Sequence, residues 1–82
     1  MMMNSEIKVL LAEDDENLGK LLSNYLEKKD FSVSLARNGR EAYNFFVNSS
    51  FSICILDVMM PEMDGIELAN EIREVDKKIP IL

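Results

Sequence analysis

The sequence predicts an α/β fold built on a doubly wound parallel sheet, with elements in the order β-α-β-α-β-α-β. Short apolar runs that suit buried strands alternate with stretches whose apolar residues recur at helical spacing. Such alternation is typical of parallel sheets joined by right-handed crossovers. In addition, acidic residues directly follow two of the predicted strands, at the sheet edge where folds of this class place their ligands.

The first predicted strand is the mostly apolar run at residues 7–12, which suits a central position in the sheet. Asp14 or Asp15 is suited to cap the helix that follows. That helix has apolar residues at the spacing of one buried face, namely Leu18, Leu21, Leu22, Tyr25 and Leu26. The second strand, at residues 31–35, alternates apolar residues with serines, which predicts one exposed face and an edge position.

The remaining elements are predicted from capping pairs and apolar runs. Asn38 with Glu41, and Asp64 with Glu67, are capping pairs for the second and third helices. The residues predicted to be buried on these helices are Ala42, Phe45 and Phe46 on the second and Leu68, Ala69, Ile72 and Val75 on the third. Residues 51–56 are almost continuously apolar, which predicts a third strand covered on both faces. A loop at residues 76–78 precedes the start of a fourth strand at residues 79–82, where Pro80 is tolerated.

Length and composition narrow the range of functions. The 82 residues allow one small domain, and a net charge of −6 argues against nucleic-acid contact by this segment. No apolar stretch approaches the roughly 20 residues of a membrane span, and residues 1–6 read as a disordered lead-in rather than a signal peptide. The single cysteine, Cys54, lies within an apolar run and is predicted to be a small core residue, which favours a reducing, cytoplasmic location.

Two acidic groups are predicted to meet at one site. Glu13 and Asp14 follow the first strand, and Asp57 follows the third. In a doubly wound sheet these two strands are neighbours, and their carboxyl ends face the same crevice. Crowded carboxylates repel one another unless a cation neutralises them, and Mg²⁺ prefers such oxygen ligands. An ionised aspartate in this setting can attack phosphorus to give an aspartyl-phosphate.

These motifs carry a resemblance to a known family. The clusters Glu13-Asp14-Asp15 and Leu56-Asp57-Val58-Met59-Met60-Pro61-Glu62-Met63-Asp64-Gly65 resemble those of the receiver domain of bacterial two-component response regulators, and the resemblance spans residues 7–82. It implies a flavodoxin-like topology, with Asp57 as the acceptor of a phosphoryl group from a sensor histidine kinase. It also implies a Mg²⁺ site formed by Glu13, Asp14, Asp57 and the backbone carbonyl of Met59, with Glu13 acting through water.

Four other positions near these motifs have lesser roles or none. Pro61 stiffens the loop after Asp57, and Gly65 lets the third helix start close to the sheet. Gly39 reads as a first-turn residue of the second helix with no role of its own. Asp15 reads as a helix cap rather than a direct metal ligand.

The resemblance also implies that residues 1–82 are the N-terminal portion of a receiver. Family members have five βα units, and this sequence stops within the predicted fourth strand. The Ser/Thr and Lys with which the family contacts the phosphoryl group would follow Leu82. The fourth strand would then be an open edge and one sheet face would lack a helix. Because exposed edges and apolar patches recruit partners, the sequence predicts a homo-oligomer formed through that edge or face.

Three alternative classes of protein compete with this interpretation. A haloacid-dehalogenase-like phosphatase needs Asp-x-Asp after the first strand, whereas Asp57 follows the third and Met59 stands two residues later. A nucleotide-binding protein needs a glycine-rich loop after the first strand, where this chain has three acids. An inactive structural fragment that folds only as a dimer or a swapped assembly stays open. The preferred prediction is a phosphate-accepting signalling module rather than an enzyme.

Overall fold

The computed structural model of the chain describes residues 7–60 and 62–82. The predicted lead-in at residues 1–6 and the predicted role of Pro61 therefore lie outside the described residues. Strands and helices alternate, as predicted: β1 (Ile7–Ala12), α1 (Glu16–Lys28), β2 (Phe31–Ala36), α2 (Gly39–Asn48), β3 (Ile53–Leu56) and α3 (Gly65–Val75). Within the described part of the chain, none of the helices is long and apolar enough to cross a bilayer.

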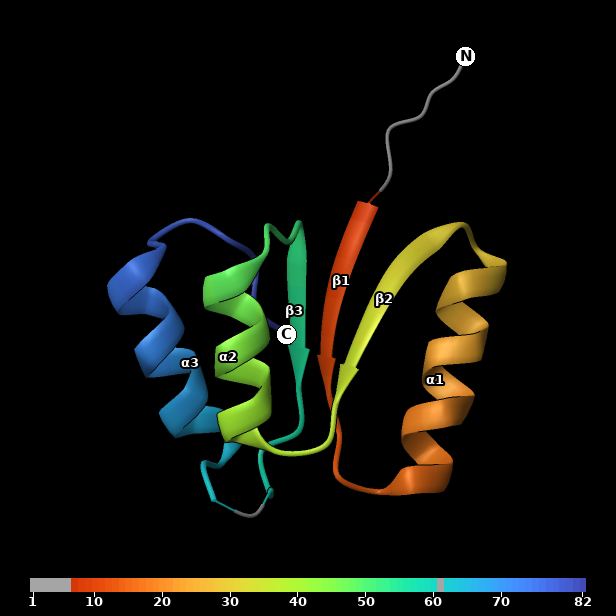
Figure 1. Ribbon diagram of the computed structural model, residues 1–82, viewed down its shortest axis with the longest axis horizontal. Coiled ribbons are helices and arrows are strands. Elements are labelled where there is room, and N and C mark those ends of the chain that lie inside the picture. Colours follow the sequence, from red (N-terminus) through yellow and green to blue (C-terminus); the bar gives the residue numbers. More distant parts are fainter. Residues whose placement is uncertain (1–6, 61) are drawn as a thin grey trace.

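The three strands form a parallel sheet in the order β2-β1-β3. The first and third strands are therefore neighbours, as predicted, and β2 lies at an edge. Figure 1 shows α2 and α3 on one side of this sheet and α1 on the other, so the sheet is doubly wound. The carboxyl ends of all three strands lie at the same edge, which brings the loops after β1, β2 and β3 together.

The predicted fourth strand is present as a short paired segment rather than a full ladder. Ile81 forms a parallel bridge with Cys54, outside the three named strands. The Cys54 N–H donates to the Pro80 carbonyl, and the Leu82 N–H donates to the Cys54 carbonyl, both at 2.9 Å. Pro80 is compatible with this pairing because it contributes only its carbonyl oxygen. The segment runs beside β3 and forms the outer edge of the sheet in the described residues.

The main core lies between the sheet and the pair α2 and α3. Its most deeply buried members are Leu10, Ala12, Ala36, Ala42, Cys54, Leu68 and Ile72, each at most 1% exposed. The predicted burial of Ala42 and Phe46 on α2 and of Leu68 and Ile72 on α3 is confirmed. Cys54 is a core residue, as predicted, and burial raises the pKa of its thiol to about 11, so the thiol stays protonated at neutral pH.

The prediction that α1 buries one continuous apolar face is wrong. Leu18, Leu21 and Tyr25 are exposed, whereas Leu22 and Leu26 are half-buried. The helix α1 packs mainly on β2, which is the edge strand of the sheet. The sheet therefore ends before it has covered the full width of the apolar stripe on α1. The described residues therefore leave part of this stripe uncovered.

Three further burial predictions are corrected for a related reason. Ile53 and Ile55 on β3 are half-buried, so this strand is not fully covered on both faces. Val75, at the end of α3, is 58% exposed. Along β2 the expected alternation is also absent, because Phe31–Leu35 are all half-buried. Each strand face is covered only where a helix lies over it.

The connection from α1 to β2 provides a stability prediction. Asp30 follows the helix and has a φ of 71°, a left-handed conformation that favours glycine. Its N–H donates to the Glu27 carbonyl at 3.0 Å, so the conformation is part of the helix end. We expect Asp30→Gly to raise the free energy of unfolding by about 0.5–1 kcal/mol, measured by urea denaturation. Asp30→Ala is the control, and a similar gain from alanine would contradict the backbone explanation.

Candidate functional site

The structure brings together the three acids that follow β1 and β3. One carboxylate oxygen from each of Glu13, Asp14 and Asp57 lies within 4.8 Å of the other two. Glu13 is buried at 8% exposed, Asp57 is half-buried and Asp14 is exposed. The group thus has one enclosed member and two that solvent reaches.

The sheet itself positions these acids. The Glu13 N–H donates to the Ala36 carbonyl at 3.0 Å, which continues the pairing of β1 with β2 by one residue. The Asp57 N–H donates to the Ala12 carbonyl at 2.9 Å, which does the same for β3 and β1. Because the backbone of two of the three acids is fixed by the ladder rather than by a loop, their separation is set by strand spacing.

The acids repel one another. Burial raises the pKa of Glu13, and the neighbouring carboxylates of Asp57 and Asp14 raise it further. The Asp15 N–H, which donates to Glu13 Oε2 at 3.1 Å, acts in the opposite direction. A net rise means that the ionised site is electrostatically strained. Three hard carboxylate oxygens in such a site fit a hard divalent cation such as Mg²⁺, which would relieve the strain.

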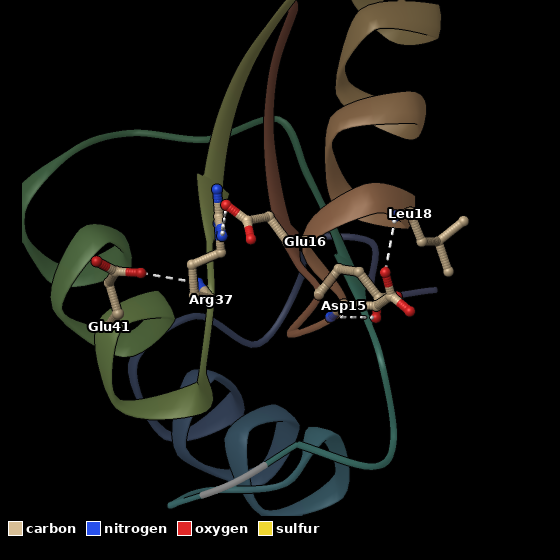
Figure 2. A network of polar contacts seen from close by, with 6 residues as sticks. Asp15, Glu16, Leu18, Arg37 and Glu41 are labelled. Atoms are coloured by element: carbon tan, nitrogen blue, oxygen red, sulfur yellow. Dashed lines mark hydrogen bonds and ion pairs between the residues drawn. The ribbon is translucent and has the colours of Figure 1, made fainter.

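A polar network holds the loop after β1, and Figure 2 shows it. Asp15 caps α1 by accepting the Leu18 N–H at 3.0 Å, so its carboxylate serves the helix, as predicted. Glu16 pairs with Arg37 at 3.7 Å across to the end of β2. The Arg37 N–H in turn donates to Glu41 Oε1 at 2.7 Å. The network ties the loop of Glu13 and Asp14 to the start of α2.

On the other side of the site, α3 starts against the backbone of Asp57. A Cβ on Gly65 would overlap the Asp57 carbonyl oxygen and lie 2.9 Å from Val58 Cα. The Gly65 N–H donates to the Val58 carbonyl at 3.0 Å, and the Met59 N–H donates to Asp57 Oδ1 at 3.2 Å. The prediction that Gly65 lets this helix start close to the sheet is confirmed, and the close approach is to Asp57 itself.

The prediction that Gly39 has no role is wrong. A Cβ on Gly39 would overlap the Met63 carbonyl oxygen and lie 2.6 Å from Met63 Cβ. This glycine lets the first turn of α2 pack directly on the loop between β3 and α3. Met60 and Met63 anchor the same loop, since both are less than 9% exposed. The loop that carries Asp57 is therefore held by contacts from α2 as well as from α3.

The loop after β3 also contributes a residue that sequence reasoning placed only as a helix cap. Asp64 caps α3 by accepting the Glu67 N–H at 2.8 Å. It also lines a cavity of about 440 Å³ together with Asp14, Val58, Met59 and Met60. The sequence did offer one signal for this location, because Asp64 lies seven residues after Asp57 at the end of the same loop. Met59 lies at this cavity and is 81% exposed, whereas Met60 is buried.

The fold agrees with the comparisons to known proteins. The model of the response regulator receiver domain matches residues 9–82, and the chain belongs to this family. It is 42% identical over 80 residues to the transcriptional regulatory protein RprY of Bacteroides fragilis, covering 98% of this chain and 34% of the relative. It is 39% identical over 75 residues to SrrA of Staphylococcus aureus, covering 92% and 31%. The chain thus spans about a third of these curated relatives.

Solved receiver structures share the fold. The non-phosphorylated HemR receiver domain of Leptospira biflexa has a TM-score of 0.87 and 34% identity, covering 93% of this chain and 61% of that one. The chemotaxis protein CheY4 of Vibrio cholerae has a TM-score of 0.90 and 32% identity, covering 94% and 66%. The response regulator TrrA of Thermotoga maritima, solved with Mg²⁺ and BeF, has a TM-score of 0.88 and 33% identity, covering 92% and 65%. These likenesses confirm the flavodoxin-like, doubly wound topology.

Proposed function

We propose that Asp57 accepts a phosphoryl group from a sensor histidine kinase in a reaction that requires Mg²⁺. The observation that carries this proposal is the convergence of the Glu13, Asp14 and Asp57 carboxylates within 4.8 Å at the carboxyl ends of β1 and β3. Membership of the receiver family and the structure of TrrA with Mg²⁺ and BeF support it.

Each site residue has a defined part in the proposal. Glu13, Asp14, Asp57 and the backbone carbonyl of Met59 would hold the ion, with Glu13 acting through water. Bound Mg²⁺ would neutralise the crowded carboxylates and the oxygens of the incoming phosphoryl group. The Met59 N–H orients Asp57 by binding Oδ1. A carboxylate oxygen of Asp57 then forms a bond to phosphorus as the bond from phosphorus to the donor atom breaks.

The proposed donor is supported by complexes of similar proteins. TrrA, which is 33% identical to this chain, has been solved with the histidine kinase ThkA, and the receiver of Ssk1 with the phosphotransfer protein Ypd1. The kinase partner of this chain, a cytoplasmic location and the lack of nucleic-acid contact by this segment are part of the same proposal. The buried free thiol of Cys54 supports the cytoplasmic location. The acidic composition supports the lack of nucleic-acid contact.

A second candidate is a structural assembly without phosphotransfer. Leu18, Leu21 and Tyr25 on α1 are 42–65% exposed, and the segment at residues 79–82 forms an outer edge of the sheet. Association of two copies through this face would cover the exposed residues of α1, and association through this edge would cover the segment at residues 79–82. This candidate predicts an oligomer in which Asp57 stays unmodified.

One experiment separates the two candidates. We expect an intact-mass spectrum of the chain, after incubation with Mg²⁺ and a small acyl phosphate, to show one phosphoryl adduct. Asp57→Asn should remove the adduct, and omission of Mg²⁺ should reduce it strongly. Asp15→Asn is the matched control, because Asp15 caps α1 and should leave the adduct in place. A folded chain without an adduct would contradict the proposal, and a native spectrum would report the oligomer.

A further inference from the structure

The loop after Asp57 presents three methionines in different surroundings. Met60 and Met63 are 8% and 6% exposed and belong to the main core. Met59 is 81% exposed and lies at the cavity that Asp14 and Asp64 also line. Because Met59 is so exposed, its side chain does not pack in the core. Any effect of this side chain on the site therefore comes from the chemistry of its sulfur atom.

We propose that Met59 is a peroxide-sensitive modification site and that its sulfoxide strengthens divalent-cation binding at the neighbouring acids. The inference rests on the Mg²⁺ site of the proposed function. In the oxidation the sulfur lone pair attacks one peroxide oxygen, the O–O bond breaks, a sulfur–oxygen bond forms and water leaves. Sulfur loses two electrons, and the peroxide gains them.

Selectivity follows from exposure. A peroxide must reach the sulfur, and solvent reaches Met59 about ten times more extensively than Met60 or Met63. Cys54, the one cysteine in the chain, is fully buried on β3, and burial keeps its thiol protonated and unreactive. Among the described residues, the sulfur atom of Met59 is therefore expected to react fastest with an oxidant.

The effect on the cation follows from ligand hardness. A thioether sulfur is a soft donor that Mg²⁺ does not favour, whereas a sulfoxide offers a hard, polarised oxygen. Mg²⁺ retains several waters when it binds to proteins, and those waters need acceptors. Oxidation would add such an acceptor at the rim of the cavity that Asp14 also lines, two residues along the chain from Asp57. The Met59 N–H that holds Asp57 Oδ1 stays in place, because the change is confined to the side chain.

The first readout of the test needs no cation. The chain is treated with dilute hydrogen peroxide, and fragment-ion mapping of the peptide 57–63 gives the oxidation rate of each methionine. We expect Met59 to react about tenfold faster than Met60 and Met63, with the three rates converging in denaturant. Equal rates in the folded chain would overturn the proposal.

The second readout is Mg²⁺ affinity by titration calorimetry before and after oxidation. We expect the dissociation constant to fall about threefold in the oxidised chain. Met59→Leu keeps the backbone carbonyl and the side-chain volume. Peroxide treatment of this variant should leave its affinity unchanged, which separates the effect of Met59 from that of the other methionines in the chain. Unchanged or weaker affinity in the oxidised parent would overturn this inference alone. Absence of Mg²⁺ binding in both forms would overturn the proposed metal site together with it.

Discussion

Gly65→Ala is expected to destabilise the folded chain by about 3 kcal/mol and to disturb the site at Asp57 in the same step. The added Cβ would overlap the Asp57 carbonyl oxygen and lie 2.8 Å from the Asp57 carbonyl carbon and 2.9 Å from Val58 Cα. All three atoms belong to the backbone, so no side-chain rotation relieves the overlap. The helix α3 must move away from β3, which also breaks the bond from the Gly65 N–H to the Val58 carbonyl.

Gly19→Ala is the matched control for this prediction. A Cβ on Gly19 would meet the Leu35 side chain at 3.3 Å, and the methyl groups of leucine can shift slightly. Because Gly19 lies within α1, alanine also gains up to about 1 kcal/mol of helix propensity. Urea denaturation should therefore show a large loss for Gly65→Ala and little change or a gain for Gly19→Ala. Equal midpoints for the two variants would show that α3 does not depend on its close approach to Asp57.

The helix caps and the glycine contacts show which parts of the fold the sequence predicts. Helix starts were predicted correctly at Asp15, Asn38 and Asp64, because a cap depends on residues three positions apart. The close packing of Gly39 on Met63 was missed, because it joins the first turn of α2 to the loop after β3, and only the assembled fold brings these two segments together. A helix cap can be predicted from a few neighbouring residues. A close contact between segments that are distant in the sequence cannot.

The acidic site was predictable for a different reason. Strand order in a doubly wound sheet follows from the alternation of elements, so the residues after β1 and β3 were expected to meet, and their carboxylates do lie within 4.8 Å. The exposure of Leu18, Leu21 and Tyr25 was not predictable in this way. A helical stripe shows which side of a helix is apolar, but it does not show how far the sheet beneath it extends.

Replacing Glu13 by glutamine is expected to have opposite effects on the metal-free and metal-bound chains. Without a cation, Glu13→Gln removes one of three like charges that lie within 4.8 Å of one another. Such repulsion costs about 1 kcal/mol per pair in a water-like dielectric and more at a buried position, so the free energy of unfolding should rise by at least about 1 kcal/mol. With the carboxylate gone, Mg²⁺ affinity should fall about tenfold.

The pH dependence gives an independent measure of the same strain. The pKa of Glu13 is raised above its ordinary value of 4.5, first by burial and then by Asp57 and Asp14. The folded chain therefore holds the proton more tightly than the unfolded chain, and the stability from this group is fully present below pH 4.5. It is lost as the pH rises through the folded pKa, so the metal-free parent should lose stability toward neutral pH.

The carboxylate of Asp76 limits the pH range in which this effect of Glu13 can be measured. The N–H groups of Lys78 and Ile79 donate to Asp76 Oδ1 and hold the pKa of that carboxyl below its ordinary value of 3.8. Its contribution has the opposite sign, because it is present above pH 3.8 and is lost as the pH falls through the folded pKa. Urea denaturation between about pH 4.5 and pH 7 therefore reports on Glu13 with little interference from Asp76.

The comparison of parent and Glu13→Gln across this window decides what Glu13 does. In the absence of Mg²⁺ the stability gained by the variant should grow as the pH rises, and saturating Mg²⁺ should cancel or reverse that gain. If the metal-free variant were instead less stable at every pH, the bond from the Asp15 N–H to Glu13 Oε2 would outweigh the repulsion, and Glu13 would be a structural acceptor. A gain without Mg²⁺ and a loss with it would show that the site gives up stability in the metal-free chain for cation affinity.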